Sequence, residues 1–284
     1  MLVARSIDHA RRAVAEARAA GQQIAFVPTM GALHAGHTSL IDAARDSSAC
    51  VVVSIYVNPT QFGPNEDFTI YPRTFEADSE AAIRAGTHLL FAPTDSEIYP
   101  VNDQTRVHPG PLAEKLCGPY RPGHFEGVCT VVAKLFNIIQ PDIAYFGQKD
   151  AQQALIIQRM VEDLRMPVRI IVCPTVRDPD GLAMSSRNAR LAPKDRAMAL
   201  SLYKSLCLAR DRLIAGENSL GRIIAAMRST IGEHAEIRVD YLSIVDAATL
   251  ETPLTPAGRL LIAGAIRIGR TRLIDNLVVD LPTA

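Results

Sequence analysis

The chain has 284 residues, of which 48% are apolar and 21% are charged. This length can bury a substantial core in one large or two modest domains, and this composition excludes an intrinsically disordered chain. Thirty basic residues balance thirty acidic ones, so the formal net charge is zero. A balanced charge gives no general attraction to nucleic acid or anionic lipid, so recognition must come from local groups.

The cysteines and the N-terminus predict a soluble protein of the cytoplasm. Five cysteines are scattered at positions 50, 117, 129, 173 and 207, without a CxxC pair. They predict small buried side chains in a reducing compartment rather than a disulfide framework or a structural zinc site. The first residues mix charged and apolar types, which argues against a signal peptide. No apolar stretch approaches ~20 residues, so no membrane span is expected.

The first 175 residues alternate between short apolar runs and segments with helical spacing. Residues 7–20 form the first expected helix, which stops before Gly21. The expected strands are IAFVP (24–28), CVVVSIYV (50–57), HLLFAP (88–93), IAYFG (143–147) and VRIIVC (168–173). The expected helices between them cover residues 38–48, 128–139 and 151–164. This order predicts an α/β domain with a Rossmann-like, doubly wound parallel sheet over residues 1–175.

A second, smaller α+β domain is predicted over residues 176–284. It opens with a polar connection, VRDPDGLAMSSRNARLAPKDR, which is typical of a hinge or lid. Two helices over residues 194–215 and 219–233 follow. Three short strands are expected in IRVDYLSIV, RLLIAGAIRIG and RLIDNLVV.

The loop after the first expected strand of the sheet carries His34 and His37, with Gly31 and Gly36 around them, at the entry to a helix. A helix start presents unpaired N–H groups and a partial positive charge, and glycine lets a phosphate approach the backbone. Two histidines three residues apart face one side and can donate to phosphate oxygens. The pattern is similar to the HxGH loop of nucleotidyl-transferring enzymes. The alternative is a pair of solvated histidines, and a zinc site is disfavoured because no matching ligand spacing exists.

Two further loops at the same edge of the sheet carry polar side chains. Asn58 and Gln61 suit a ligand with hydroxyls beside a carboxylate, although alone they would indicate a polar turn. Lys149, within the GQKD segment at residues 147–150, is a compact cation suited to a transferring phosphoryl group. Gln153 lies one turn further along the same expected helix. The alternative is that Lys149 is a surface residue, as a lone lysine at a helix start more often is.

The segment Met184-Ser185-Ser186-Arg187 lies in the connection between the two predicted domains. Two hydroxyls and a guanidinium in a glycine-bearing segment can close on a triphosphate and donate to it as charge develops. The alternative is a flexible linker with a solvated arginine. Together with the loops above, this segment predicts a cationic, donor-rich crevice for the phosphates of ATP.

These segments, in their order, make the chain resemble the pantothenate synthetase family of HxGH adenylylating enzymes. The resemblance covers nearly the whole chain and rests on FVPTMGALHAGH, NPTQFG, YPRT, HFEGVCTVV, FGQKDAQQ, TVRDPDGLAMSSRN and RLIDN. It implies ATP-dependent condensation of (R)-pantoate with β-alanine through a pantoyl adenylate, which gives pantothenate for coenzyme A synthesis, AMP and pyrophosphate. It also implies a Mg²⁺ requirement without identifying the metal ligands, and a homodimer.

The resemblance assigns roles to individual positions. His37 becomes a proton donor, His34 a further phosphate ligand and Lys149 the principal cation. Gln61 and Gln153 are assigned to pantoate, and Gln61 also to β-alanine. The residues assigned to ATP are Met30, Gly31, Ala32, Leu33, His34, Ala35, Gly36, His37, Gly147, Gln148, Lys149, Asp150, Val176, Met184, Ser185, Ser186 and Arg187. The roles of Asn58, Tyr71 and Arg121 are left open.

Two other functions stay open on the residues alone. A nucleotidylyltransferase that keeps the adenylate as product uses the same HxGH loop, but its phosphate-bearing acceptor needs extra arginine or lysine. This chain offers Asn58, Gln61 and Gln153 there instead. The second is a non-catalytic nucleotide-binding or tRNA-interacting module, which zero net charge and the lack of a basic stripe disfavour.

Overall fold

A computed structural model describes residues 1–47, 49–64, 66–232, 234 and 236–282. These residues form two compact units. The first unit comprises Met1–Gly110, Arg121–Gln148 and Gln153–Val176. The second unit comprises Pro111–Tyr120, Lys149–Gln152 and the chain from Arg177 onward. The chain therefore passes between the units several times, and the second unit takes two short segments from within the first 175 residues.

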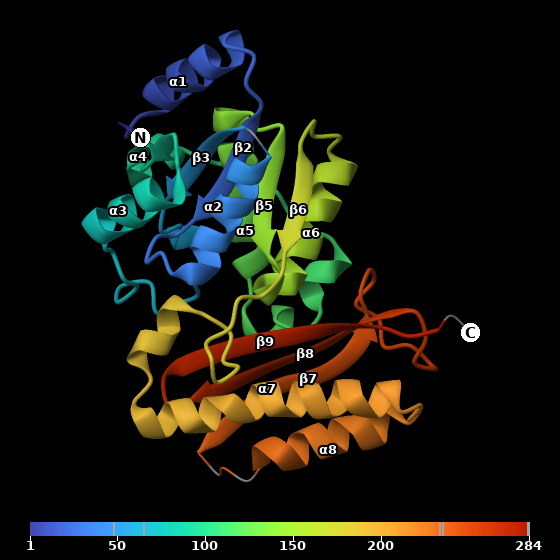
Figure 1. Cartoon of the computed structure of the whole chain (residues 1–284). Coiled ribbons are helices and arrows are strands. Elements are labelled where there is room, and N and C mark those ends of the chain that lie inside the picture. The colour runs from blue at the N-terminus through green and yellow to red at the C-terminus, as the bar shows by residue number, and fades with distance from the viewer. Residues whose placement is uncertain (48, 65, 233, 235, 283–284) are drawn as a thin grey trace. The chain divides into compact units, whose positions relative to one another are not determined.

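The first unit is built on a six-stranded parallel sheet with the order β1-β4-β3-β2-β5-β6 (Figure 1). Its strands are β1 (Leu2–Ala4), β2 (Ile24–Thr29), β3 (Cys50–Ile55), β4 (Leu89–Phe91), β5 (Ile143–Gly147) and β6 (Arg169–Cys173). The predicted doubly wound α/β fold is confirmed. The three-residue strand β1 was not predicted, because so short a segment carries no readable pattern.

The strand order reverses between β2 and β5, which pair side by side at the centre of the sheet. From β2 the chain moves outward through β3 to β4, and from β5 it moves the other way to β6. Such a reversal opens a crevice beyond the carboxyl ends of the two strands, where ligands bind in sheets of this class. Thr29 ends β2 and Gly147 ends β5, so the loops that follow these two residues flank the crevice.

Helices cover both faces of this sheet. They are α1 (Ile7–Ala19), α2 (Ala35–Asp46), α3 (Phe75–Ala85), α4 (Asp95–Ile98), α5 (His124–Ile139) and α6 (Ala151–Asp163). On one face Leu40 and Ile41 of α2 pack with Val27 of β2 and with α3. On the other face the Phe26 ring meets the edge of Phe136 of α5, with 6.3 Å between ring centroids. Neighbouring residues of β2 therefore serve opposite faces of the sheet.

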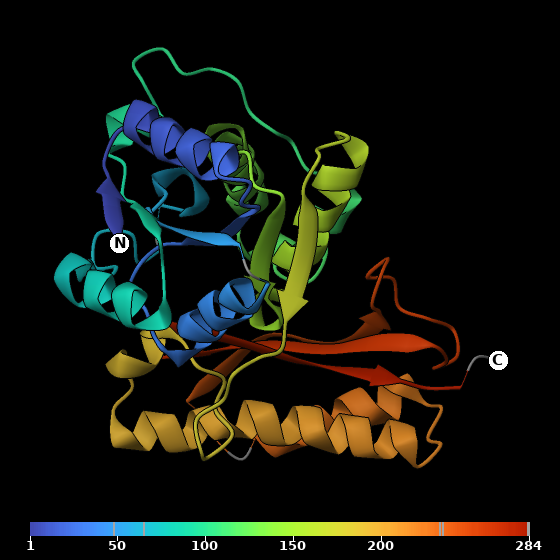
Figure 2. The ribbon, with the colours of Figure 1, turned by 45° about the horizontal axis from the view of Figure 1, so that its top comes forward.

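The second unit is an α+β fold, as predicted. Its three antiparallel strands, in the order β7-β8-β9, are β7 (Ile237–Asp246), β8 (Arg259–Ile268) and β9 (Thr271–Asp280). The three predicted strand segments are confirmed, and each observed strand has ten residues. The helices α7 (Pro193–Ile214) and α8 (Leu220–Gly232) pack together on one face of this sheet (Figure 2). The predicted end of the second helix, Glu233, lies outside the described residues.

Apolar side chains of the two helices form the core of the second unit. Leu206 of α7 and Ile223 and Met227 of α8 are fully buried together with Leu260 and Ile262 of β8. On β9 the odd-numbered residues Leu273, Leu277 and Val279 join this core. Alternation along a strand directs its even-numbered side chains to the opposite face.

Candidate active site

Asp78 holds the loop that follows β2. This carboxylate is buried in the first turn of α3 and accepts the backbone N–H groups of Ala32 and Leu33 at 2.9 and 2.7 Å. Gly31 and Ala32 both have positive φ, of 81° and 50°. A Cβ atom on Gly31 would lie 2.9 Å from the Asp78 carboxylate and 3.0 Å from Ile55, so only glycine fits there. The loop is therefore fixed before helix α2 begins.

His34 and His37 form a reciprocal cap at the start of α2. Nδ1 of His34 accepts the Gly36 N–H at 3.1 Å, and Nδ1 of His37 accepts the His34 N–H at 3.3 Å. The ring centroids are 4.1 Å apart. A neutral imidazole whose Nδ1 accepts a hydrogen bond carries its proton on Nε2. The backbone thus sets both rings with an Nε2–H donor.

This cap explains a difference from the predicted helix, which began at residue 38. Residues 35–37 form the first turn of α2 because His34, an unusual capping residue, satisfies an N–H group at the helix start. The sequence prediction that the two histidines face one side is confirmed by their ring contact. The N-terminal end of α2, with its partial positive charge, follows the loop after β2 at the switch point of the sheet.

Asn58 is a buried hub that holds Gln61 in the loop after β3. Its Nδ2 group donates to Gln61 Oε1 at 3.0 Å and to the Gly127 carbonyl at 3.1 Å. Its Oδ1 atom accepts from Thr60 and from the Tyr99 hydroxyl. Because the Asn58 amide is committed to these partners, it serves to orient Gln61 rather than to face a ligand.

Gln61 connects this loop with the loop after β2. Its Nε2 atom lies 3.0 Å from Sδ of Met30. Helix α5 packs closely against the short 3-10 helix η1 (Pro59–Gln61), and a Cβ atom on Gly127 would collide with the Thr60 carbonyl oxygen. The glycine in HFEGVCTVV is thus required for the close approach of α5 to Gln61.

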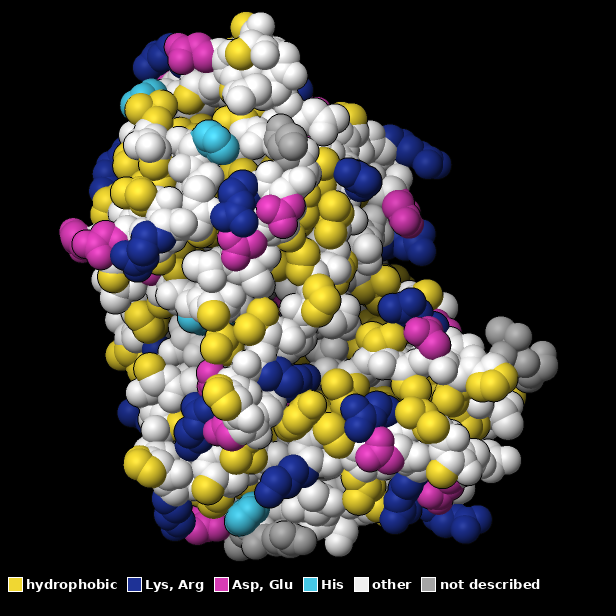
Figure 3. All heavy atoms as spheres, in the orientation of Figure 1, with side chains coloured by type: hydrophobic (Ala, Val, Ile, Leu, Met, Phe, Trp, Pro, Cys, Tyr) yellow, Lys and Arg dark blue, Asp and Glu magenta, His cyan; other side chains and the backbone are white. Residues whose placement is uncertain are grey.

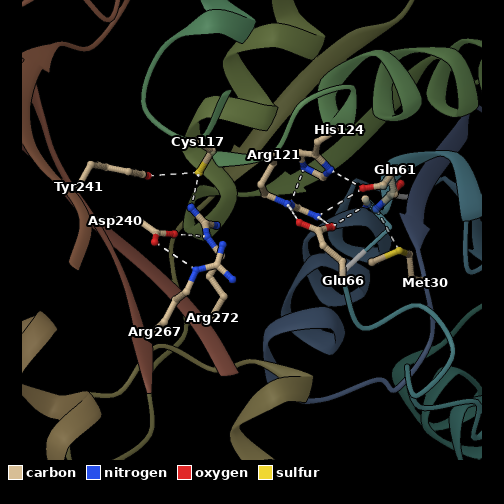
Figure 4. A network of polar contacts seen from close by, with 11 residues as sticks. Met30, Gln61, Glu66, Cys117, Arg121, His124, Asp240, Tyr241, Arg267 and Arg272 are labelled. Carbon is tan, nitrogen blue, oxygen red and sulfur yellow. Dashed lines mark hydrogen bonds and ion pairs between the residues drawn. The ribbon is translucent and has the colours of Figure 1, made fainter. Parts of the chain in front are cut away.

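A second network fixes the backbone of Gln61 (Figure 4). Arg121 makes a two-pronged ion pair with Glu66, at 2.6 Å from Nε and 2.7 Å from Nη2. His124 Nε2 lies 2.8 Å from Arg121 Nη1, so its Nδ1–H can donate to the Gln61 carbonyl, also at 2.8 Å. Arg121, whose role the sequence left open, therefore supports the carbonyl of a predicted site residue.

The Glu66 carboxyl is ionised at neutral pH in this network. Burial raises its pKa, but the hydrogen bonds and charge of Arg121 and the Gly63 N–H outweigh burial, so the pKa is lowered. A lowered pKa in the folded state means that the pairing stabilises the loop at neutral pH. That contribution is lost as the pH falls through the lowered pKa.

The loop after β5 divides between the two units. Gly147 and Gln148 belong to the first unit, together with Gln153 and Val176. Lys149 and Asp150 belong to the second unit, and Lys149 Nζ lies 3.8 Å from the Asp150 carboxylate. Both residues are part of the short 3-10 helix η4 (Gln148–Asp150).

The Met184–Arg187 segment lies in the second unit as well. Ser185 caps the short 3-10 helix η5 (Ser186–Arg190), and its Oγ atom accepts the Arg187 N–H at 3.3 Å. Helix η5 packs against β9. The Asn276 side chain of β9 also bonds to the Lys149 carbonyl at 2.9 Å. Lys149 and the serine-arginine segment therefore adjoin the same strand.

The predicted site residues thus fall into two groups. In the first unit, His34 and His37 lie in ring contact, and Gln61 contacts Met30 at the start of the same loop. In the second unit, β9 adjoins both Lys149 and η5. The sequence did not single out Asp78, Glu66 or His124. Each acts through a contact with residues 45 to 63 positions away in the chain, for which no local signal exists.

The cysteines agree with the sequence prediction of small buried side chains. All five cysteines are free thiols, four of them buried, and burial raises the pKa of Cys129 to about 12. The described residues contain no cluster of three or more side chains that could hold a metal ion. None of the helices in the described ranges is both long and apolar enough to cross a membrane. On the face drawn in Figure 3, basic and acidic side chains are interspersed.

Known sequences place the chain in a family. The family model described as Pantoate-beta-alanine ligase matches residues 2–278. The pantothenate synthetase of Moorella thermoacetica is 53% identical over 281 residues, which are 99% of each chain. Pantothenate synthetase 1 of Bradyrhizobium diazoefficiens is 49% identical over 283 residues, again 99% of each chain.

Solved structures agree with these sequences. Pantothenate synthetase from Thermus thermophilus superposes with a TM-score of 0.91 at 44% identity, over 98% of this chain and 99% of that one. Pantoate-beta-alanine ligase from Francisella tularensis, solved in complex with beta-gamma ATP and β-alanine, gives 0.78 at 35% identity, over 98% and 97%. The resemblance drawn from the sequence is confirmed: the chain belongs to the pantoate–β-alanine ligase family.

Proposed function

We propose that this chain condenses (R)-pantoate with β-alanine at the expense of ATP and releases pantothenate, AMP and pyrophosphate. Family membership over nearly the whole chain supports this activity. Among the chain's own residues, the His34–His37 cap gives the main support for this activity. The cap sets two Nε2–H donors at the switch point of the sheet. Fixed donors at a helix start suit a phosphate chain.

In the first step, a carboxylate oxygen of pantoate attacks the α-phosphorus of ATP. A new P–O bond forms, the bond to pyrophosphate breaks, and pantoyl adenylate remains. Negative charge grows on the phosphoryl oxygens and on the leaving pyrophosphate. The Nε2–H groups of His34 and His37 and the Lys149 ammonium donate hydrogen bonds to these oxygens. Ser185, Ser186 and Arg187 serve the same triphosphate, as do the other residues assigned to ATP.

In the second step, the neutral amine of β-alanine attacks the acyl carbon of the adenylate. The new C–N bond forms, the C–O bond to AMP breaks, and the nitrogen loses a proton. The adenylate hydrolyses easily, so water must be kept away from it. We propose that the predicted division into an ATP- and pantoate-binding domain (1–175) and a lid domain (176–284) serves this exclusion.

The Mg²⁺ requirement fits a site shared with the triphosphate. Mg²⁺ is usually held by one or two carboxylates together with phosphates and water. Asp150, beside Lys149 and about half exposed, is the carboxylate that would contribute, and the described residues offer no complete protein cage. When bound, the metal neutralises charge on the phosphates. A cytoplasmic location is proposed on the cysteine usage and the N-terminal sequence, and a homodimer on the family resemblance alone.

Gln61 and Gln153 are proposed to hold pantoate, and Gln61 also β-alanine. Uncharged amides can pair with both the hydroxyls and the carboxylate of pantoate. The networks around Asn58 and Arg121, which fix the side chain and the carbonyl of Gln61, support this role because a binding amide must be held in one orientation.

Replacement of Gln153 by alanine should weaken pantoate binding about tenfold and leave ATP affinity unchanged, since a lost hydrogen bond to substrate costs about 1 kcal/mol or more. Titration calorimetry with each substrate measures both. The matched control is Gln22→Ala, at an exposed glutamine just before β2. Unchanged pantoate affinity in the Gln153 variant would remove Gln153 from the pocket.

Pyrophosphate release tests the proposed function against its rivals. With ATP and pantoate alone, the enzyme should release about one equivalent of pyrophosphate and stop, because the adenylate stays bound. Addition of β-alanine should start continuous turnover. A nucleotidylyltransferase would not depend on β-alanine, and a non-catalytic module would release no pyrophosphate. Either result would overturn the proposal.

A further inference from the structure

The RLIDN segment of β9 supports the resemblance but has no role in the reaction described above. Its Asp275 and Asn276 are each only 5% exposed, although both are polar. Buried polar groups cost free energy unless they are paired, so their partners indicate what they do. All partners described below belong to the second unit.

Asn276 holds the backbone of Lys149. It lies on the face of β9 that is opposite the α7–α8 core, and its Nδ2 group donates to the Lys149 carbonyl at 2.9 Å. A hydrogen bond to this carbonyl fixes the orientation of the peptide unit. It thereby sets the direction in which the Lys149 side chain leaves the backbone.

Asp275 holds the base of the segment that leads to Met184–Arg187. It lies on the core-facing side of β9, and its two oxygens pair with Arg177 at 2.6 and 2.9 Å. The Arg177 guanidinium also lies 4.0 Å from the centroid of the Tyr203 ring and donates to the Gly181 carbonyl at 3.1 Å. Removal of one partner from such a buried charge pair leaves the other charge uncompensated and is strongly destabilising.

The turn after Arg177 packs closely against the same Tyr203 ring. Arg177 pairs with Ala183 in an isolated antiparallel bridge. Gly181 has a φ of 96°, and a Cβ atom there would lie 2.6 Å from the Tyr203 ring. Met184 follows this turn in the chain. Helix η5 comes next and packs against β9 itself. Asp275 therefore anchors the point from which the serine-arginine segment starts.

We infer that Asp275 and Asn276 are positioning residues that set both proposed phosphate-binding elements of the second unit, Lys149 and Met184–Arg187, from two adjacent positions of one strand. The inference rests on the proposed function, which assigns those elements to ATP. Neither residue touches the substrate in this account. Small displacements of a phosphate-stabilising cation reduce rates strongly, so fixing its backbone matters.

A double-mutant cycle tests the Asn276 half of the inference. Asn276→Ala should slow single-turnover pyrophosphate release about tenfold and weaken apparent ATP affinity, with pantoate affinity unchanged. In a Lys149→Ala background the same change should have no further effect, because Asn276 acts through Lys149. Asn276→Ser, which keeps a shorter donor, guards against a folding failure. The control Asn137→Ala removes a similar bond, to the Ala133 carbonyl of α5, and should change neither rate nor affinity.

The outcomes separate the inference from the proposed function. No loss of rate in Lys149→Ala would defeat the role of Lys149 itself. The inference alone is wrong if Lys149→Ala slows pyrophosphate release strongly but Asn276→Ala does not act through Lys149. In that case Asn276→Ala has no effect on the rate, or it has the same fold effect with and without Lys149. An Asn276 effect confined to the background with Lys149 present supports it.

Asp275→Asn tests the other half, because it preserves shape and removes the charge that pairs with Arg177. Apparent ATP affinity should fall several-fold while pantoate affinity holds. The matched control is Asp240→Asn, since Asp240 is a buried carboxylate of the same sheet that is held by Arg267 and Arg272 at 3.1 and 2.8 Å (Figure 4). Equal loss of ATP affinity in both variants would indicate a general loss of stability and overturn the assignment.

Discussion

Replacement of Lys149 by alanine is expected to slow the formation of pantoyl adenylate by about 10²-fold or more. In this account Lys149 is the principal cation on the phosphates, and removal of one fixed donor to a developing oxyanion commonly costs this much. Single-turnover release of pyrophosphate, with ATP and pantoate but without β-alanine, measures the step directly. Lys149→Arg should restore little of the rate of adenylate formation, because a planar guanidinium does not replace a compact ammonium.

Lys194→Ala is the matched control for this variant. Lys194 is largely exposed at the start of α7 and pairs with Glu236 at the surface, at 3.0 Å. Its loss should leave the rate of adenylate formation unchanged, because exposed ion pairs contribute little. A Lys149→Ala enzyme that forms adenylate at the normal rate would show that the transferred group is stabilised elsewhere.

Replacement of His34 by asparagine is expected to separate the two roles of this residue. The asparagine Oδ1 atom can take the place of Nδ1 and accept the Gly36 N–H, because asparagine is among the best helix-capping residues. It cannot supply the Nε2–H donor. His34→Asn should therefore keep its thermal unfolding midpoint while adenylate formation falls about 10²-fold. His34→Ala should lose the same activity and also about 1 kcal/mol of folding stability.

Calorimetric unfolding and the single-turnover assay together decide this prediction. If His34→Asn keeps the wild-type rate, the Nε2 atom has no part in the reaction and the cap is the sole role of His34. If His34→Asn and His34→Ala lose stability equally, the capping geometry does not contribute as described.

The extent to which the fold could be predicted depends on how local its signals are. Strand β5 was predicted with the same bounds as observed, because an apolar run of five residues ends at a glycine. Helix α2 was predicted to begin three residues late, because histidine is rarely a cap and glycine within the first turn disfavours a helix. Helix α3 was not predicted, although it supplies Asp78, which clamps the HxGH loop.

The residues assigned to the site were found through motifs, but the contacts that hold them were not. The HxGH spacing predicts two histidines on one side, yet it does not reveal that each Nδ1 accepts a backbone N–H and so sets the tautomer. Asn58 was expected to suit a ligand, whereas its amide is committed to neighbouring groups. Arg121 and Glu66 meet across 55 positions of the chain, which only the folded structure reveals.

Isotope transfer from pantoate tests the central claim, that the carboxylate attacks the α-phosphorus of ATP. With pantoate labelled by ¹⁸O in both carboxylate oxygens, the account predicts one ¹⁸O atom in each AMP, measured by mass spectrometry after complete turnover with β-alanine. The bridging oxygen must stay with AMP when the amine displaces it. Label found in pyrophosphate or inorganic phosphate, or AMP that carries no label, would contradict the account.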